Sequence, residues 1–342
     1  MKLRGISYDV GTFTSKDNSS RPTFDRDVVR REMEIIARDL HCNAVKIYGQ
    51  DIERLTFAAE CGLANGLEVW LSPQFHNASE AETLAYLVEC ARAAEELRQR
   101  FSGKVVFVTG CELTFFMKGL VDGDDSFDRM MTFFKPWRLL KSAIFRGGFN
   151  KRLNSFLRRA AGAVRESFGG PLTYASGPWE EVDWSVLDFV GVDYYRDART
   201  RPKYREGLRK YFRHQKPVAI LEFGCCTYQG AEDKGGYGWA IVDRTQTPRR
   251  LKGEFVRDEK LQAAEIRELL EIFENESVYA AFVFTFVMET YPHRAEPMFD
   301  LDRASYGIVK TRGAGASATY NDVPWEPKES FAKIAEFYQA LE

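Results

Sequence analysis

The sequence lacks the features that mark several classes of protein. Its 48 Lys and Arg residues nearly balance its 50 Asp and Glu residues, and the net charge of −2 offers no basic excess for nucleic acid. No apolar run approaches the roughly 20 residues that a membrane span needs. Residues 1–9 also lack the apolar stretch of a signal peptide. We therefore expect a cytoplasmic protein that binds neither nucleic acid nor membranes.

The cysteine spacing that is typical of zinc sites is missing as well. The six cysteines contain no CxxC pair of the zinc-binding kind. We therefore expect free thiols in a reducing compartment, and neither a metal nor another cofactor. An alternative is a metal or redox site in which Cys111, Cys225 and Cys226 join His76 and a glutamate, although their spacing matches no zinc signature.

Strand-like and helix-like segments alternate along the chain, which predicts a parallel α/β sheet. A barrel of eight strand–helix units needs roughly 250 residues, and insertions enlarge it. We therefore expect residues 1–342 to form one (β/α)8 barrel domain, with insertions at 115–149 and 224–252, after strands four and seven. The predicted strands are 3–8, 44–48, 68–72, 105–109, 172–175, 189–193, 218–221 and 279–285. The predicted helices are 24–40, 52–65, 79–101, 151–167, 179–187, 203–214, 258–275 and 328–341.

Two glutamates stand directly after short apolar runs. Glu112 follows the strand at 105–109, and Glu222 follows the strand at 218–221. Barrel enzymes carry their catalytic groups at these carboxyl ends of strands. A buried strand end is a poor place for a glutamate unless function or ion pairing holds it there. Two carboxyl groups brought together at this end could hydrolyse a glycosidic bond, whereas structural salt bridges are the alternative.

Several short motifs occur in an order that resembles the retaining glycoside hydrolases of clan A. The resemblance covers nearly the whole chain. It rests on a helix at 24–40 leading into residues 43–48 (NAVKIY), and on residues 66–71 (GLEVWL), 193–195 (DYY) and 306–310 (YGIVK). It implies an eight-fold barrel whose acid/base follows strand four and whose nucleophile follows strand seven.

The resemblance assigns roles to individual residues and also exposes departures. It makes Glu112 the acid/base and Glu222 the nucleophile, and it places Tyr195 against the nucleophile. Four positions depart from that family: Cys111 replaces an Asn, Lys46 an Arg, Asp193 a His and Phe284 a Trp. Because Lys lacks the planar fork of Arg, the group that grips the sugar is changed. These changes favour an unusual substrate or altered chemistry.

Other side chains at strand ends are candidates for substrate contact. His76 could bind a hydroxyl or tune Glu112, or be a purely structural histidine. Lys46 could keep Glu222 ionised, or form an ion pair without function. Trp179 could stack on a sugar ring or pack in the core. The full predicted substrate-binding set is Lys46, Tyr48, His76, Asn77, Cys111, Trp179, Asp193, Tyr195 and Phe284.

Three functions from different classes remain open from the sequence. The first is a retaining enzyme of carbohydrate metabolism that hydrolyses a (β-)glycosidic bond in a small molecule or oligosaccharide. The second is a barrel that uses the same carboxylates for other chemistry on a sugar-like or other small molecule. A Schiff-base role for Lys46 would belong to this class. The third is a non-catalytic binding or defence protein of the abortive-infection kind, because fold alone does not fix function.

Overall fold

Eight parallel strands form the centre of the computed structural model, which describes residues 1–342 except 16, 17, 103, 134, 136, 138–146 and 312–318. Their order is β7-β6-β5-β4-β1-β12-β9-β8, so chain neighbours lie side by side in the sheet. The strands are β1 Leu3–Asp9, β4 Ala44–Gly49, β5 Glu68–Pro73, β6 Val105–Cys111, β7 Leu172–Ala175, β8 Val190–Asp193, β9 Val218–Phe223 and β12 Ala280–Val283. Each overlaps a strand predicted from the sequence.

Ser176 brings the two outer strands together. Its backbone N–H donates to the carbonyl of Gly191 at 3.1 Å, and its carbonyl accepts from the N–H of Asp193 at 2.8 Å. These bonds join the end of β7 to β8, which nearly closes the sheet into a barrel. The predicted (β/α)8 architecture is confirmed.

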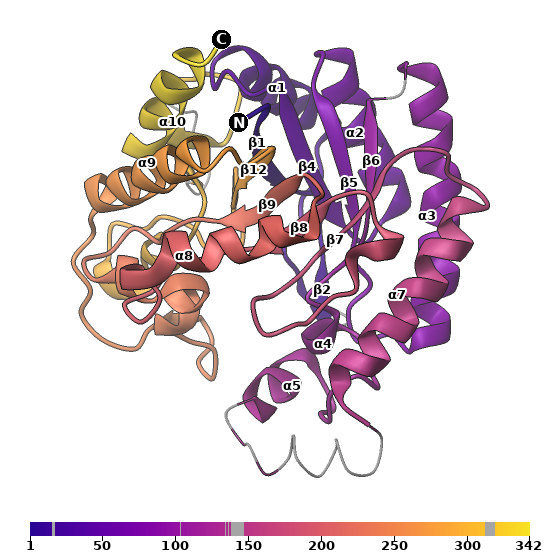
Figure 1. Cartoon of the computed structure of the whole chain (residues 1–342). Coiled ribbons are helices and arrows are strands. Elements are labelled where there is room, and N and C mark those ends of the chain that lie inside the picture. The colour runs from indigo at the N-terminus through magenta and orange to yellow at the C-terminus, as the bar shows by residue number, and fades with distance from the viewer. Residues whose placement is uncertain (16–17, 103, 134, 136, 138–146, 312–318) are drawn as a thin grey trace.

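Helices surround the strands, with α2, α3 and α7 on one side and α9 and α10 on the other (Figure 1). Side chains that cap the helix N-termini fix where several of them begin. In α3, for example, Ser79 and Glu82 satisfy each other's backbone N–H groups in a capping box. The helices around the barrel are α1 Arg26–Arg38, α2 Ile52–Ala64, α3 Glu80–Arg100, α7 Phe149–Arg165, α8 Tyr204–Arg209, α9 Glu259–Asn275 and α10 Glu329–Gln339.

The interior of the barrel is packed with side chains from facing strands. Trp70 of β5 contacts Phe189 and Phe282, with ring centroids 4.9 and 5.2 Å apart. Gly5 of β1 faces the Phe282 ring, and a Cβ on Gly5 would stand 2.4 Å from it. A larger residue at position 5 would therefore push this ring out of place. The barrel is thus a filled core, and a ligand must bind at one of its ends.

Two long segments extend from the carboxyl ends of barrel strands. The first follows β6 and contains α4 Leu113–Phe116 and α5 Ser126–Thr132, which lie at that end (Figure 1). Part of the predicted insertion at 115–149 lies outside the described residues. The second segment follows β9. It contains η4 Ala231–Asp233, η5 Gly235–Ile241 and a hairpin of β10 Val242–Asp243 and β11 Arg250–Leu251.

Two of the predicted helices were wrong in extent. The segment at 179–187 contains only one 3-10 turn, η1 Trp184–Val186, because the Asn154 side chain bonds the Glu181 carbonyl and the Asp183 N–H. These backbone groups are therefore not available to an α-helix. The helix at 203–214 is divided into η2 Arg201–Lys203, α8 and η3 Lys210–His214.

Two short hairpins were not predicted. They are β2 Phe13–Ser15 with β3 Asn18–Ser19, and β13 Val309–Thr311 with β14 Trp325–Pro327. The remaining 3-10 turns are η6 Pro297–Phe299 and η7 Leu301–Ala304. None of the helices in the described ranges combines the length and the apolar character that a bilayer crossing requires.

Candidate active site

Both glutamates singled out in the sequence line one cavity of about 640 Å³. This volume lies in the range of sites that bind small molecules. Aromatic, acidic and basic side chains line its walls. Six of the predicted residues line it: Glu112, Trp179, Asp193, Tyr195, Glu222 and Phe284.

Glu222, near the end of β9, has a charged and a neutral donor on its carboxylate. The ammonium of Lys46 donates to Oε1 at 2.8 Å, and the hydroxyl of Tyr195 donates to Oε2 at 3.2 Å. Burial lowers the pKa of Lys46, but Glu222 and Asp193 outweigh it and raise that pKa. Lys46 therefore remains a cation, and both donors stabilise negative charge on Glu222.

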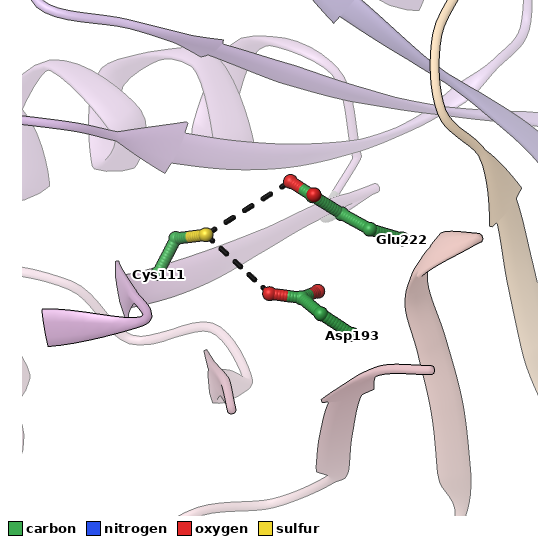
Figure 2. Close-up of side chains that lie close together, drawn as sticks. All are labelled: Cys111, Asp193 and Glu222. Atoms are coloured by element: carbon green, nitrogen blue, oxygen red, sulfur yellow. Dashed lines mark hydrogen bonds between the residues drawn. The ribbon is translucent and has the colours of Figure 1, made fainter. Parts of the chain in front are cut away.

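A thiol stands beside two carboxylates in this site. Figure 2 shows the Cys111 sulfur facing Asp193 and Glu222, at 3.4 Å from Oδ2 of Asp193 and 3.9 Å from Oε1 of Glu222. Burial, and then the two carboxylates, raise the pKa of the Cys111 thiol well above its usual range. Cys111 is therefore a protonated donor. A thiol offers one weak donor and cannot make the hydrogen bonds of the amide that the sequence resemblance implied at this position.

Asp193 is almost fully buried at the end of β8. Burial, and then the charge of Glu222, raise its pKa well above the usual range. Its Oδ1 has no hydrogen-bond partner among the described residues. Asp193 also lines the cavity, although this oxygen is itself buried.

The alternative metal or redox site is not assembled as hypothesised. The sulfur of Cys111 and carboxylate oxygens of Asp193 and Glu222 lie within 4.8 Å of one another. Among the described residues, this is the only group of metal-ligand side chains, and it includes neither His76 nor the two adjacent cysteines. Cys225 and Cys226 are instead buried in a separate apolar cluster beside the second long segment.

Glu112 occupies a turn between β6 and α4. Its backbone is left-handed, with φ 40° and ψ 48°, and its N–H donates to the carbonyl of Ala175 at 2.9 Å. Burial, and then the charges of Asp193 and Glu222, raise the pKa of Glu112 well above its usual range. This shift favours the protonated form of Glu112, which is the state that a general acid requires.

Glu180, which the sequence analysis missed, fixes the chain directly after Glu112. Its carboxylate accepts hydrogen bonds from the N–H and the hydroxyl of Thr114, at 3.2 and 2.6 Å, and from the hydroxyl of Tyr174 at 2.9 Å. The Tyr174 oxygen in turn accepts from the N–H of Leu113 at 2.8 Å. No periodic pattern marked this acid in the sequence, because it lies in the irregular stretch after β7.

Glu180 should make the stability of the fold depend on pH. Burial raises its pKa from 4.5 to about 7, although the bonds from Thr114 and Tyr174 oppose this. Because the folded pKa is the higher one, the contribution is fully present below about 4.5 and is lost as the pH rises through about 7. Relative to Glu180→Gln, the wild type should lose about 3 kcal/mol of unfolding free energy across this range. Urea unfolding at a series of pH values measures the difference, and parallel pH profiles for the two proteins would contradict it.

Two predicted residues lie away from the large cavity. His76 stacks on Phe116, with ring centroids 4.3 Å apart, and lines a separate, much smaller cavity with Cys111. Burial, and then Arg129, lower the pKa of His76 to about 4. Asn77 accepts hydrogen bonds from Ser126 at 3.0 Å and from Arg129, both on α5. In this structure both residues support the segment after β6.

Two aromatic residues are placed next to the cavity by stacking. Tyr48 does not line the cavity but stacks on Phe284, which does, with ring centroids 5.7 Å apart. Trp179 stacks on Phe115 at 4.4 Å, and its indole N–H donates to Thr114 at 2.9 Å. The Trp179 ring is therefore tied to the same chain segment that carries Glu112.

The segments after β9 and after β12 contribute lining residues that were not predicted as site residues. They are aromatic or cationic, and they come from η5, from the adjoining hairpin and from the chain after β12. The sequence predicted an insertion at 224–252 but did not indicate which of its side chains line the cavity. The residues are Lys234, Tyr237, Trp239, Arg244, Arg249, Tyr291 and Tyr306.

Comparison with known proteins places the fold. No protein-family model matches the chain, and no curated protein matches it. A family GH113 β-1,4-mannanase has a TM-score of 0.63 and 14% identity over 99% of this chain and 100% of its own. The GH113 β-mannanase of Alicyclobacillus acidocaldarius has a TM-score of 0.60 and 17% identity over 100% and 98%. An apo β-glucosidase has a TM-score of 0.53 and 13% identity over 99% and 98%.

These likenesses define the class of fold. The chain has the (β/α)8 barrel found in those glycoside hydrolases, matched over nearly its full length and theirs. The barrel implied by the sequence motifs is therefore confirmed. At 13–17% identity the likeness concerns the fold, and the chemistry must be argued from the site.

Proposed function

We propose that this protein hydrolyses a β-glycosidic bond with retention of configuration. The observation that carries the proposal is the contrast between Glu112 and Glu222 within one cavity. The first has a pKa raised by burial, and the second accepts from a buried ammonium at 2.8 Å. A retaining glycosidase needs one protonated and one ionised carboxyl in this way. We propose a β-linkage because the structures that share the fold include β-mannanases and a β-glucosidase.

In the first half of the reaction, Glu112 donates its proton to the leaving glycosidic oxygen. The Glu222 carboxylate attacks the anomeric carbon, and a covalent glycosyl-enzyme forms. Lys46 and Tyr195 hold the two carboxylate oxygens and orient the attack. As negative charge leaves Glu222, Glu112 becomes the more acidic partner, because one of the charges that raise its pKa is lost.

In the second half, the ionised Glu112 takes a proton from water. The resulting hydroxide attacks the anomeric carbon, and the bond to Glu222 breaks. The aromatic wall formed by Trp179 and Phe284 provides faces on which sugar rings can stack. Asp193 lines the same cavity and adds an acidic group near these rings.

A panel of aryl α- and β-glycosides tests the proposal. We expect turnover of at least one β-glycoside, with a product whose first-formed anomer is β by NMR. Formation of the α-anomer from a β-glycoside would contradict retention. No turnover across a panel of hexosides, pentosides, uronides and phosphorylated glycosides would contradict the hydrolase proposal.

Lys46 should set the acidic limb of the pH profile. Replacing its buried ammonium in Lys46→Met removes the cation that faces Glu222 at 2.8 Å. We expect the acidic limb of kcat/KM to move up by roughly 1–3 pH units, since an adjacent opposite charge has an effect of that size. Lys46→Arg, which keeps the charge, is the matched control. An unmoved limb in a folded Lys46→Met protein would show that Lys46 has a structural role only.

The replaced residues around Glu222 favour a second candidate function. Lys46, Cys111 and Asp193 all contact or neighbour this carboxylate, and each differs from its counterpart in the enzymes that the sequence resembles. The same acid and base could instead perform proton transfer or dehydration on a sugar-like molecule. Turnover of such a compound by a protein that leaves every glycoside intact would favour this candidate.

A further inference from the structure

Two arginines of the hairpin segment line the same cavity as the two glutamates. Arg244 follows β10 and Arg249 precedes β11, so both belong to the short connection between these strands. The proposed hydrolysis does not use either of them. Arg244 is exposed and Arg249 is half-buried, and their surroundings differ from those of arginines such as Arg196 and Arg257.

Arg244 is fixed by aromatic residues. Its guanidinium lies over the ring of Trp239, 4.4 Å from the centroid, and its Nη2 donates to the hydroxyl of Tyr291 at 3.1 Å. A ring face and a phenol orient the group without neutralising it. Only one of the five N–H donors of this guanidinium is therefore engaged by the described residues.

Arg249 is held by the same aromatic residue. Its guanidinium lies 5.4 Å from the centroid of the Tyr291 ring, and its Nη2 donates to the carbonyl of Thr290. Arg249 is half-buried in this position. Tyr291, which is itself buried, thus orders both arginines on one wall.

Neither arginine has an acidic partner in the described part of the chain. By contrast, Arg196 pairs with Glu265 and Glu268, and Arg257 pairs with Asp300 and Asp302. Arginine is favoured where a planar group must grip a carboxylate or phosphate. Two arginines that are held by aromatic residues and lack such a partner leave N–H donors that can bind an oxyanion.

The acidic floor of the cavity does not cancel these two charges. Lys46 pairs with Glu222 at 2.8 Å, and this ion pair adds no net charge. Burial raises the pKa of both Glu112 and Asp193, which favours their uncharged forms. Lys234 adds another cation to the lining, while Arg199 faces Asp197 at 3.8 Å. The cavity therefore has a positive wall opposite little negative charge.

We propose that Arg244 and Arg249 form a subsite for an anionic substituent, so that the substrate is a sugar bearing a carboxylate or phosphate. That the acidic sugar is a substrate rests on the proposed function, whereas its binding to the two arginines can be measured without turnover. The two arginines would hold the acidic group while the aromatic wall contacts the ring.

Binding of matched ligands to Glu112→Gln tests the proposal, because that variant retains the pocket without its acid. The probes are glucuronate against glucose, and glucose 6-phosphate and mannose 6-phosphate against the unmodified hexoses, measured by titration calorimetry at low salt. We expect at least one acidic sugar to bind about tenfold or more tightly than its neutral partner. This preference should disappear when Arg244→Gln and Arg249→Gln are added. It should remain with Arg250→Gln, a control on the same hairpin that does not line the cavity.

Each outcome decides between the acidic and the neutral substrate. Equal or absent binding of acidic and neutral sugars would overturn the proposal, as would a preference that survives the double substitution. The result separately informs the hydrolase proposal. If binding depends on the two arginines but the wild type turns over no glycoside, the subsite proposal is supported and the hydrolase proposal is contradicted. If the protein hydrolyses neutral glycosides and shows no preference for acidic sugars, the hydrolase proposal is supported and the subsite proposal is contradicted.

Discussion

Glu222→Ala is expected to abolish turnover of any glycoside that the wild type hydrolyses, with a loss on the order of 10⁴-fold or more in kcat. In the proposed mechanism Glu222 forms the covalent bond on which both halves of the reaction depend. Among the described residues that line the cavity, it is the carboxylate with a cation at 2.8 Å. Initial rates with an activated aryl β-glycoside measure the loss.

A small anion separates a nucleophile from a structural residue at this position. Azide can enter the space left by the Glu222 side chain and attack the anomeric carbon, so it should restore turnover and give the α-glycosyl azide. Glu222→Gln keeps a partner for Lys46 and serves as the folded control, since an unpaired buried cation is strongly destabilising. A β-configured azide product, or full activity in either variant, would contradict the assignment of Glu222.

Glu112→Gln is expected to lower kcat on the order of 10²–10⁴-fold for glycosides with poor leaving groups. The loss should be much smaller for a dinitrophenyl glycoside, because that leaving group needs no proton. The pH dependence follows from the sign of the shift. Burial raises the pKa of Glu112 and the acid must be protonated, so wild-type activity falls as the pH rises through this raised value.

The alkaline limb is the matched measurement for Glu112. It should be present in the wild type and absent in Glu112→Gln, because the amide cannot titrate. A limb that persists in the variant would assign the titration to another group, such as Asp193, whose pKa burial also raises. Equal losses for good and poor leaving groups would contradict a role as general acid.

The strands of this barrel could be predicted from the sequence because each is a short apolar run bounded by polar residues or glycine. Residues 172–175 were predicted and found as β7, and the run before Glu222 ends within β9. The predicted helix at 179–187 failed for a reason outside its own sequence. Its backbone groups bond the side chain of Asn154 on α7, and local periodicity carries no information about that contact.

The site was predictable where its residues stand at strand ends. Glu112, Asp193 and Glu222 share a cavity because parallel strands end at the same edge. His76 also stands near a strand end, but its ring turns onto Phe116, which the sequence could not indicate. Arg244 and Arg249 were missed because their position depends on how a loop folds over the barrel.

The two glutamates and the residues of the surrounding cavity wall come from different parts of the chain. Strand ends carry Glu112 and Glu222, and Glu180 clamps the chain after Glu112 without lining the cavity. Residues 234–249 form one contiguous stretch that contributes Tyr237, Trp239 and both arginines to the wall. Exchanging this stretch would therefore alter which molecules are accepted while the reacting carboxyls keep their supports. Substrate selectivity could therefore be engineered by replacing this one loop segment, without changing the barrel strands that carry Glu112 and Glu222.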